Sequence, residues 1–340
     1  MATPRSALPV VLGNMTFGKT KTDGIRVTDP AIMAAMVDAF QAHGHNEIDT
    51  ARGYGGGTSE ETLADLGWQS RGLVMGTKLY PFGRAAMSAL TSHTYTHETG
   101  EVRRGLMDSL KALGADKIDL FYLHGPDRQT PYEETLKEVN DLYKEGYFQR
   151  FGISNYMSWE VAQINEICIR NDWIRPTVYQ GVYNALHRAI EPELMTCLRK
   201  YDMSLYSFQP LAGGFLTGRY RPDMKDDDYE AGSRFDPKKW QGRLHHDRYI
   251  NEFYFDALAI IRPEIEKAGL TMTECALRWL SHHSVMKRDT GDKVIVGASS
   301  VKQLEENLEG LEKGPLPEEI VQAMDAAWLR VKGVVPKYWH

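Results

Sequence analysis

The sequence predicts an α/β fold in which eight parallel strands close into a (β/α)8 barrel. Eight short apolar runs are each followed by a segment with helical features, and strands that alternate with helices form parallel sheets. The 340 residues suit one large barrel, and no change in composition marks a linker between domains. We therefore expect a single domain over residues 1–340.

The first four strands are expected at residues 9–13, 47–49, 73–78 and 118–123, which are apolar runs followed by turn formers or polar residues. Thr28-Asp29-Pro30 supplies a capping side chain and a first-turn proline, which predicts a helix that Gly44 ends. Another helix follows the second strand, and apolar spacing predicts two more at residues 102–110 and 132–144.

The last four strands are expected at residues 151–153, 177–179, 204–208 and 293–296, with helices at 159–170, 192–201 and 301–311. Residues 211–248 are rich in glycine, proline and charge. A connection of this length after the seventh strand suits a loop that folds over a functional site. Residues 318–331 predict an extra C-terminal amphipathic helix.

Composition and charge exclude several classes of function. A net charge of -6 and a pI near 6.0 disfavour a nucleic-acid partner. No apolar run reaches the roughly 18 residues that span a bilayer, and residues 1–9 lack the apolar core of a signal peptide. The three cysteines have no paired spacing and indicate free thiols in a reducing compartment. We expect a cytoplasmic protein without a membrane partner.

Ionisable side chains follow three consecutive strands. Asp49, Lys78 and His124 each stand at a predicted strand end, and Tyr54 lies on the loop after Asp49. In a barrel these ends meet at one rim, where barrel enzymes place their active sites. A phenol has a pKa of about 10 and is a weak acid catalyst until a cation lowers that value. Lys78 would supply the cation, Asp49 would hold Lys78, and His124 would orient a substrate carbonyl.

The remaining motifs exclude other chemistry. The sequence has no nucleophile elbow, and we predict no metal site, because His93 and His97 lie in a polar loop where such a pair is usually solvated. Gly53-x-Gly55-x-x-Thr58 nearly matches a dinucleotide fingerprint, but the next strand ends without the ribose-binding acid, which disfavours a doubly wound fold. The remaining mechanism is proton donation to a carbonyl that accepts hydride from a bound cofactor.

These residues can also be explained one at a time. Asp49 fits a helix cap, Lys78 a solvated charge, His124 a hydrogen-bonded core histidine and Tyr54 surface packing. Four independent structural roles do not explain why all four residues lie at or next to the ends of consecutive strands.

Motifs along nearly the whole chain resemble the aldo-keto reductase superfamily. They are Ile48-Asp49-Thr50-Ala51 with Tyr54, Gly76-Thr77-Lys78, Asp119-Leu120-Phe121-Tyr122-Leu123-His124, Gly152-Ile153-Ser154-Asn155, Gln180, Pro210-Leu211-Ala212-Gly213-Gly214 and Gln303-Leu304-Glu305-Glu306-Asn307. Further segments are most similar to the aflatoxin-aldehyde and succinic-semialdehyde reductases: Thr177-Val178-Tyr179-Gln180-Gly181, Leu216-Thr217-Gly218-Arg219-Tyr220, Ala276-Leu277-Arg278-Trp279 and His282-His283-Ser284.

The resemblance implies roles for individual residues. It makes Asp49, Tyr54, Lys78 and His124 a catalytic tetrad, and it makes NADPH/NADP+ the cofactor. Ser154, Asn155 and Gln180 would hold the nicotinamide carboxamide, and the ring would stack on Phe208. Ser299, Gln303, Glu306 and Asn307 would bind the adenosine with its 2′-phosphate. The same resemblance extends the cofactor site to Gly13, Met15, Gln209, Leu211, Gly213, Arg219 and Gly297.

Some positions depart from the family pattern. Phe208 stands where tyrosine is usual, Gln209 where this subgroup often has asparagine, and Gln303 where many relatives have an arginine for the 2′-phosphate. The segment 335–340, which lines the substrate pocket in relatives, is poorly matched. Arg234 falls where semialdehyde-reducing relatives bind the substrate carboxylate, although it could also pair with Asp236 or face water.

We therefore expect NADPH-dependent reduction of aldehydes and some ketones, with an aromatic, dicarbonyl or semialdehyde substrate. Two alternatives remain open: an aryl-alcohol dehydrogenase that works toward oxidation, and a non-catalytic NADPH-binding subunit that regulates a channel. The oligomeric state is also open, with a homodimer as the candidate assembly.

Overall fold

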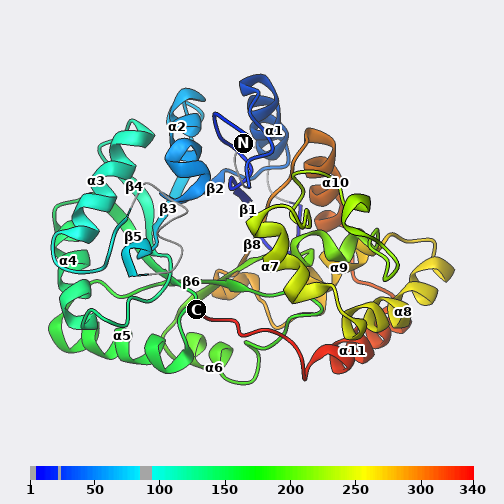
Figure 1. The fold of residues 1–340 in the computed structure, drawn as a ribbon. Coiled ribbons are helices and arrows are strands. Elements are labelled where there is room, and N and C mark those ends of the chain that lie inside the picture. The colour runs from blue at the N-terminus through cyan, green and yellow to red at the C-terminus, as the bar shows by residue number, and fades with distance from the viewer. Residues whose placement is uncertain (1–4, 22–23, 85–93) are drawn as a thin grey trace.

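A computed structural model describes residues 5–21, 24–84 and 94–340. Its eight strands form a closed parallel barrel in chain order, which confirms the predicted fold (Figure 1). The strands are β1 (Val10–Gly13), β2 (Glu47–Asp49), β3 (Val74–Leu79), β4 (Ile118–Leu123), β5 (Phe148–Ser154), β6 (Val178–Val182), β7 (Ser204–Phe208) and β8 (Lys293–Val296).

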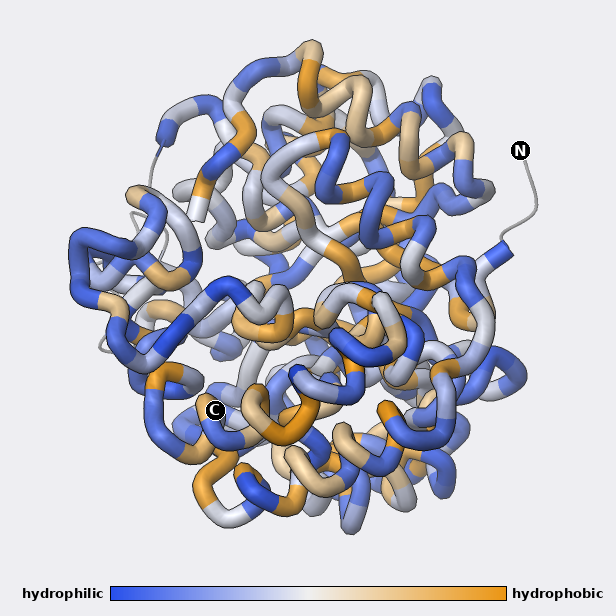
Figure 2. Tube along the Cα trace, turned by 90° about the vertical axis from the view of Figure 1, so that its right-hand side faces the viewer, coloured by the Kyte–Doolittle hydropathy of each residue, from blue (hydrophilic) through white to orange (hydrophobic). Residues whose placement is uncertain are grey.

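Helices surround the barrel. They are α1 (Pro30–Ala42), α2 (Thr58–Asp65), α3 (Glu101–Leu113), α4 (Tyr132–Lys144), α5 (Ser158–Asn171), α6 (Leu194–Lys200), α7 (Trp240–Tyr249), α8 (Glu252–Lys267), α9 (Met272–His282), α10 (Val301–Glu312) and α11 (Glu318–Val331). Short 3-10 segments are η1 (Tyr54–Gly57), η2 (Phe82–Arg84), η4 (Ala212–Thr217), η5 (Asp226–Asp228) and η6 (Arg288–Thr290). In Figure 2 hydrophobic and hydrophilic residues alternate at short intervals along the chain, as one-sided helix burial requires.

Local chemistry explains several helix ends. The Asp29 side chain accepts a hydrogen bond from the Ala31 amide at the start of α1, as predicted, and Gly44 follows its end in the left-handed region with φ 84°. Predicted α4 and α11 agree with the structure at both ends. The helix predicted over residues 192–201 is shorter, because α6 spans only Leu194–Lys200.

The long connection after β7 was predicted as a loop, and the structure agrees with this only in part. It folds over the barrel rim as predicted, since Arg234 lies beside Met15 and Gly297, but it contains the helix α7. Two further helices, α8 and α9, precede β8, and α11 packs against α8. Figure 1 shows the C-terminal segment running from α11 back toward the barrel.

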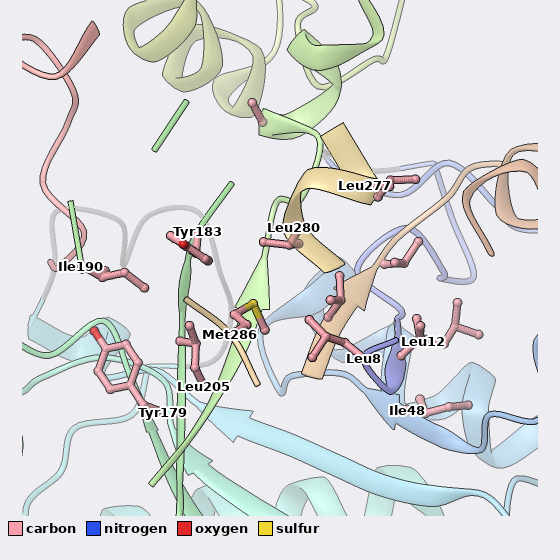
Figure 3. Close-up of a cluster of buried hydrophobic side chains, with 14 of the residues drawn as sticks. Leu8, Leu12, Ile48, Tyr179, Tyr183, Ile190, Leu205, Leu277, Leu280 and Met286 are labelled. Carbon is pink, nitrogen blue, oxygen red and sulfur yellow. The ribbon is translucent and has the colours of Figure 1, made fainter. Parts of the chain in front are cut away.

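Two apolar layers stabilise the barrel. One fills its interior and consists of Val11, Leu120, Tyr122, Val178, Tyr206 and Ile295. The other lies between strands and helices. Figure 3 shows part of it, including Leu12, Ile48 and Leu205 of the strands and Leu277 and Leu280 of α9. Below the interior layer, Glu47 pairs with Arg150 and Lys293 near the starts of the strands.

No helix within the described ranges combines the length and apolar character needed to cross a membrane. The described cysteines Cys168, Cys197 and Cys275 are all free thiols, as the sequence predicted.

Candidate active site

Strand alternation brings the predicted tetrad to one rim. Side chains two apart on a strand point the same way, so Lys78 shares the inward face of β3 with Gly76, and His124 continues the inward series of Leu120 and Tyr122. The strands are in register there, with Asp49 opposite Gly76 and Lys78 opposite Tyr122. The structure therefore brings Asp49, Lys78 and His124 together at the carboxyl ends of β2, β3 and β4.

Lys78 is fully buried and bonded on several sides. Its Nζ donates to both carboxylate oxygens of Asp49, one at 2.6 Å, and to the Thr50 carbonyl oxygen at 2.7 Å. Burial disfavours the ammonium form, but Asp49 and Tyr54 more than offset this effect, so the pKa of Lys78 lies above its ordinary value. Lys78 is therefore a fixed cation at neutral pH.

Tyr54 stands directly beside this cation. The Lys78 Nζ lies 5.0 Å from the centre of the Tyr54 ring. Burial raises the pKa of Tyr54 above its ordinary value, and the charge of Lys78 opposes this rise without cancelling it. The sequence predicted that Lys78 lowers the pKa of Tyr54, and the charge of Lys78 does act in that direction. The predicted net decrease is wrong, because the loss of hydration raises the pKa of Tyr54 by more than Lys78 lowers it.

His124 faces the same space and is neutral. Its ring centre lies 5.8 Å from that of Tyr54, with the rings nearly perpendicular. Burial and the charge of Lys78 hold the pKa of His124 well below its usual range. A neutral imidazole can donate one hydrogen bond, which is what orienting a carbonyl oxygen requires.

A buried network that the sequence did not reveal holds the Tyr54 loop on β3. The Arg52 amide donates to the Lys78 carbonyl oxygen at 3.0 Å, and the Arg52 guanidinium binds Glu60 of α2. Glu60 also accepts a 2.6 Å hydrogen bond from the Thr77 hydroxyl. These contacts fix the position of the phenol relative to the ammonium.

The residues assigned to the nicotinamide adjoin the tetrad. Ser154 and Gln180 are register partners on β5 and β6, and the Gln180 amide donates to Asp49 at 3.1 Å. The Asn155 amide donates to the His124 carbonyl oxygen at 2.9 Å and is held in the left-handed region with φ 65°. Phe208 ends β7, and Gln209 follows it.

The residues assigned to the rest of the cofactor lie along β1, β7 and β8. Gly13 ends β1 and Met15 follows, Leu211 and Gly213 lie at η4, and Gly297 follows β8. Ser299 donates to the Gln303 amide oxygen through its own amide and hydroxyl. Glu306 is exposed on α10, and Asn307 is buried there. Arg219 stands apart from this group in its bonding, since it pairs with Glu230 at 3.2 Å.

The structure also reveals groups that the sequence did not single out. Both side-chain polar atoms of Asn14, which follows β1, are buried without a hydrogen-bond partner among the described residues. His245 of α7 has a buried, unpartnered Nε2 in the same part of the structure. An asparagine or a histidine in a polar segment gives no signal in the sequence, because its burial depends on distant elements.

Two further predictions can be compared with the structure. Within the described ranges, no cluster of three or more His, Cys, Asp or Glu side chains could hold a metal ion. His97 was expected to be solvated but is 1% exposed, because its loop packs against Asp127 and Thr135; His93 lies outside the described residues.

The C-terminal segment borders the site. The His340 amide donates to the Asn155 carbonyl oxygen at 3.1 Å, and the Ser158 amide donates to the Tyr338 hydroxyl at 3.2 Å. Tyr80 lies between the rings of His124 and His340, with centre distances of 5.6 and 6.0 Å. The chain end thus forms one wall beside His124.

Comparisons with known proteins agree with this geometry. The Aldo/keto reductase family model matches residues 9–329. The chain is 52% identical to the aldo-keto reductase pigE of Monascus ruber over 338 residues, covering 99% of this chain and 98% of the relative. It is 54% identical to an aldo-keto reductase of Pseudocercospora fijiensis over 297 residues, covering 87% and 97%. It is 42% identical to the mouse aflatoxin B1 aldehyde reductase member 2 over 334 residues, covering 97% and 87%.

Proposed function

Because the chain belongs to the aldo/keto reductase family, we propose that it reduces an aldehyde to an alcohol with hydride from NADPH and a proton from Tyr54. The observation that carries the proposal is the phenol of Tyr54 beside the buried Lys78–Asp49 pair, with a neutral His124 opposite. This arrangement supplies an acid, a cation and a hydrogen-bond donor around one space at the barrel rim.

Each side chain of the tetrad has a separate role in reduction of the carbonyl. The nicotinamide supplies the hydride when it is bound. His124 holds the carbonyl oxygen by a hydrogen bond, and Tyr54 donates its proton to that oxygen as negative charge develops there. Lys78 stabilises the phenolate that remains, and Asp49 fixes the ammonium in place. Burial keeps the phenol protonated at neutral pH before the reaction, because it raises the pKa of Tyr54.

Two observations support a dinucleotide at this rim. The Asn14 amide is buried without a partner in the described structure, between Gly13 and Met15, and a ligand there would satisfy it. Gly213 and Gly214 are both left-handed, with φ 69° and 110°, so backbone without side chains faces the space after β7. We infer NADPH rather than NADH because α10 presents its N-terminus to an anion, and because the Ser300 hydroxyl accepts from the Gln303 amide and so keeps its own proton to donate.

Arg234 supports a substrate or product that carries an acidic group. Its guanidinium forms no ion pair with a carboxylate in the described part of the chain, and Asp236 is bonded instead to the amides of Gly232 and Lys238. Burial lowers the pKa of Arg234, and the neighbouring Tyr54 opposes that effect. A carboxylate on the substrate would neutralise this charge by a bidentate contact.

The test measures initial rates with NADPH and NADH on 4-nitrobenzaldehyde, succinic semialdehyde and a neutral aldehyde of similar length. We expect half-maximal turnover at a lower concentration of NADPH than of NADH. Absence of turnover with every aldehyde would favour the non-catalytic alternative, and faster alcohol oxidation would favour the dehydrogenase.

A separate comparison of a charged and a neutral aldehyde tests whether Arg234 binds the substrate carboxylate. Arg234→Ala should lower kcat/KM for succinic semialdehyde about tenfold or more relative to the neutral aldehyde, because a charged hydrogen bond contributes roughly 1.5–3 kcal/mol. Arg221→Ala is the matched control, since Arg221 is an exposed arginine of the same connection paired with Asp223. An equal decrease for both aldehydes would exclude a carboxylate contact at Arg234.

A further inference from the structure

Helix α7 carries a histidine with one nitrogen buried and unsatisfied. The Nδ1 of His245 lies 2.9 Å from the Gln241 carbonyl oxygen, which can only accept, so Nδ1 carries the ring proton. The other nitrogen, Nε2, is therefore a bare acceptor in the neutral ring. It is buried, and among the described residues it has no hydrogen-bond partner. A buried acceptor without a donor is costly, and a ligand contact is one explanation for it.

The unsatisfied edge of the imidazole faces η4. A Cβ built on Gly213 would lie 2.4 Å from Cδ2 of His245 and 2.6 Å from Nε2, so any larger residue would force the imidazole to move. Gly213 is also left-handed, with φ 69°. In Figure 1 α7 lies beside the barrel opening, near the strand ends that carry the site. His245 and the glycines of η4 thus face each other at the rim.

The cations near His245 are two guanidinium groups. Arg234 belongs to the connection after β7 and Arg248 to α7, where His246 is the adjacent titratable residue. The Tyr249 ring is 6.3 Å away, and the η4 side presents glycine backbone. Arg248 forms no ion pair with a carboxylate within the described ranges, and its guanidinium lies 3.5 Å from the Gln209 amide oxygen. A cation without a counter-charge near an unpartnered ring nitrogen favours an anionic ligand.

We propose that His245 binds a phosphate oxygen of the cofactor's diphosphate and takes up a proton when the cofactor binds. This inference rests on the proposed function, because it assumes a dinucleotide in the site. A phosphate oxygen only accepts hydrogen bonds, so contact with Nε2 requires a proton on that nitrogen. The negative charge of the diphosphate offsets the positive charge of the new imidazolium, which makes protonation of His245 favourable on binding.

The pKa of His245 in the unliganded protein decides whether cofactor binding tightens or weakens as the pH falls. Burial and Arg234 lower the pKa of His245 to about 4, so the ring is neutral at pH 7 before binding. The bound diphosphate raises that pKa. Between the two pKa values each unit of falling pH tightens binding up to about tenfold. Below pH 4 both states are protonated, and the effect of this residue ends.

Calorimetric titration of NADP+ at pH 6 and pH 8, in buffers of different ionisation enthalpy, gives both Kd and the number of protons taken up. The cofactor's own 2′-phosphate titrates near a pKa of about 6, so the comparison is between proteins. We expect the ratio of Kd at pH 8 to Kd at pH 6 to be about tenfold larger for wild type than for His245→Gln. His246→Gln, the same change at the adjacent position, should retain the wild-type ratio.

If the ratio of Kd at pH 8 to Kd at pH 6 and the proton uptake are the same in wild type and His245→Gln, the proposal is wrong. The proposed function is not contradicted in that case as long as NADP+ binds. Absence of NADP+ binding to wild type would refute the proposed function. If the variant fails to fold, ADP-ribose replaces NADP+ with the wild-type protein, since it has the diphosphate and no 2′-phosphate. Proton uptake with ADP-ribose supports the proposal, and its absence contradicts it.

Discussion

Replacing Lys78 with methionine should lower the free energy of unfolding by about 3–5 kcal/mol, because the Asp49 carboxylate stays buried without its cation. The Lys78 side chain is 0% exposed and that of Asp49 is 7% exposed. The variant also loses the 2.7 Å hydrogen bond from Lys78 to the Thr50 carbonyl oxygen. An exposed ion pair would contribute only about 0.2–1 kcal/mol, so burial decides which range applies.

A second substitution separates stability from catalysis. Asp49→Asn in the Lys78→Met background removes the buried charge, and Gln180 already lies 3.1 Å from this position to bond a neutral amide. The double variant should therefore regain most of the lost stability. It should still lack turnover, because neither substitution restores a cation beside Tyr54.

The assay is urea unfolding at pH 7 without cofactor, followed by circular dichroism, together with initial rates of aldehyde reduction. Lys137→Met is the matched control, since Lys137 pairs with Asp141 on the exposed face of α4, and its effect should stay within about 0.5 kcal/mol. A loss below about 1 kcal/mol for Lys78→Met would refute the reasoning, as would full activity in the double variant.

Three further predictions concern other parts of the structure. Gly213→Ala should weaken NADP+ binding measured by calorimetry without unfolding the protein, because its Cβ meets His245 at 2.4 Å and φ is 69°. Burial lowers the pKa of His97 to about 4, below its unfolded value, so stability falls as the pH drops below about 6.5. His97→Gln should reduce the loss of unfolding free energy between pH 7 and pH 5 by about 2 kcal/mol in urea titrations. Deleting residues 336–340 should raise KM for aldehydes in rate assays while Kd for NADP+ stays unchanged, because this segment borders His124.

Local patterns predicted the barrel because strand ends and caps are encoded locally. The strands at Ser204–Phe208 and Lys293–Val296 are short apolar runs closed by turns, and α4 and α11 have clear apolar stripes. The tetrad was predicted for the same reason, since each of its strand-end members directly follows a buried run in the sequence.

The helix α7 was missed because its sequence has no apolar stripe and contains Gly242. Distant contacts stabilise it: a Cβ at Gly242 would lie 1.7 Å from the Asp236 carbonyl oxygen, so the helix packs directly on that backbone. The raised pKa of Tyr54 depends on burial by other elements. So do the lack of an ion pair at Arg234 and the unpartnered Nε2 of His245, both judged among the described residues. Sequence spacing carries no information about such burial.

Reduction of an aldehyde with NADPH deuterated at the transferable C4 position tests the chemistry most directly, with wild type and Tyr54→Phe compared. The alcohol from wild type should carry one deuterium on the former carbonyl carbon. Tyr54→Phe should bind NADPH with unchanged Kd and turn over roughly 10²–10⁴-fold more slowly, the usual contribution of a general acid. An alcohol without deuterium, or a near-wild-type rate for Tyr54→Phe, would contradict hydride transfer assisted by this phenol.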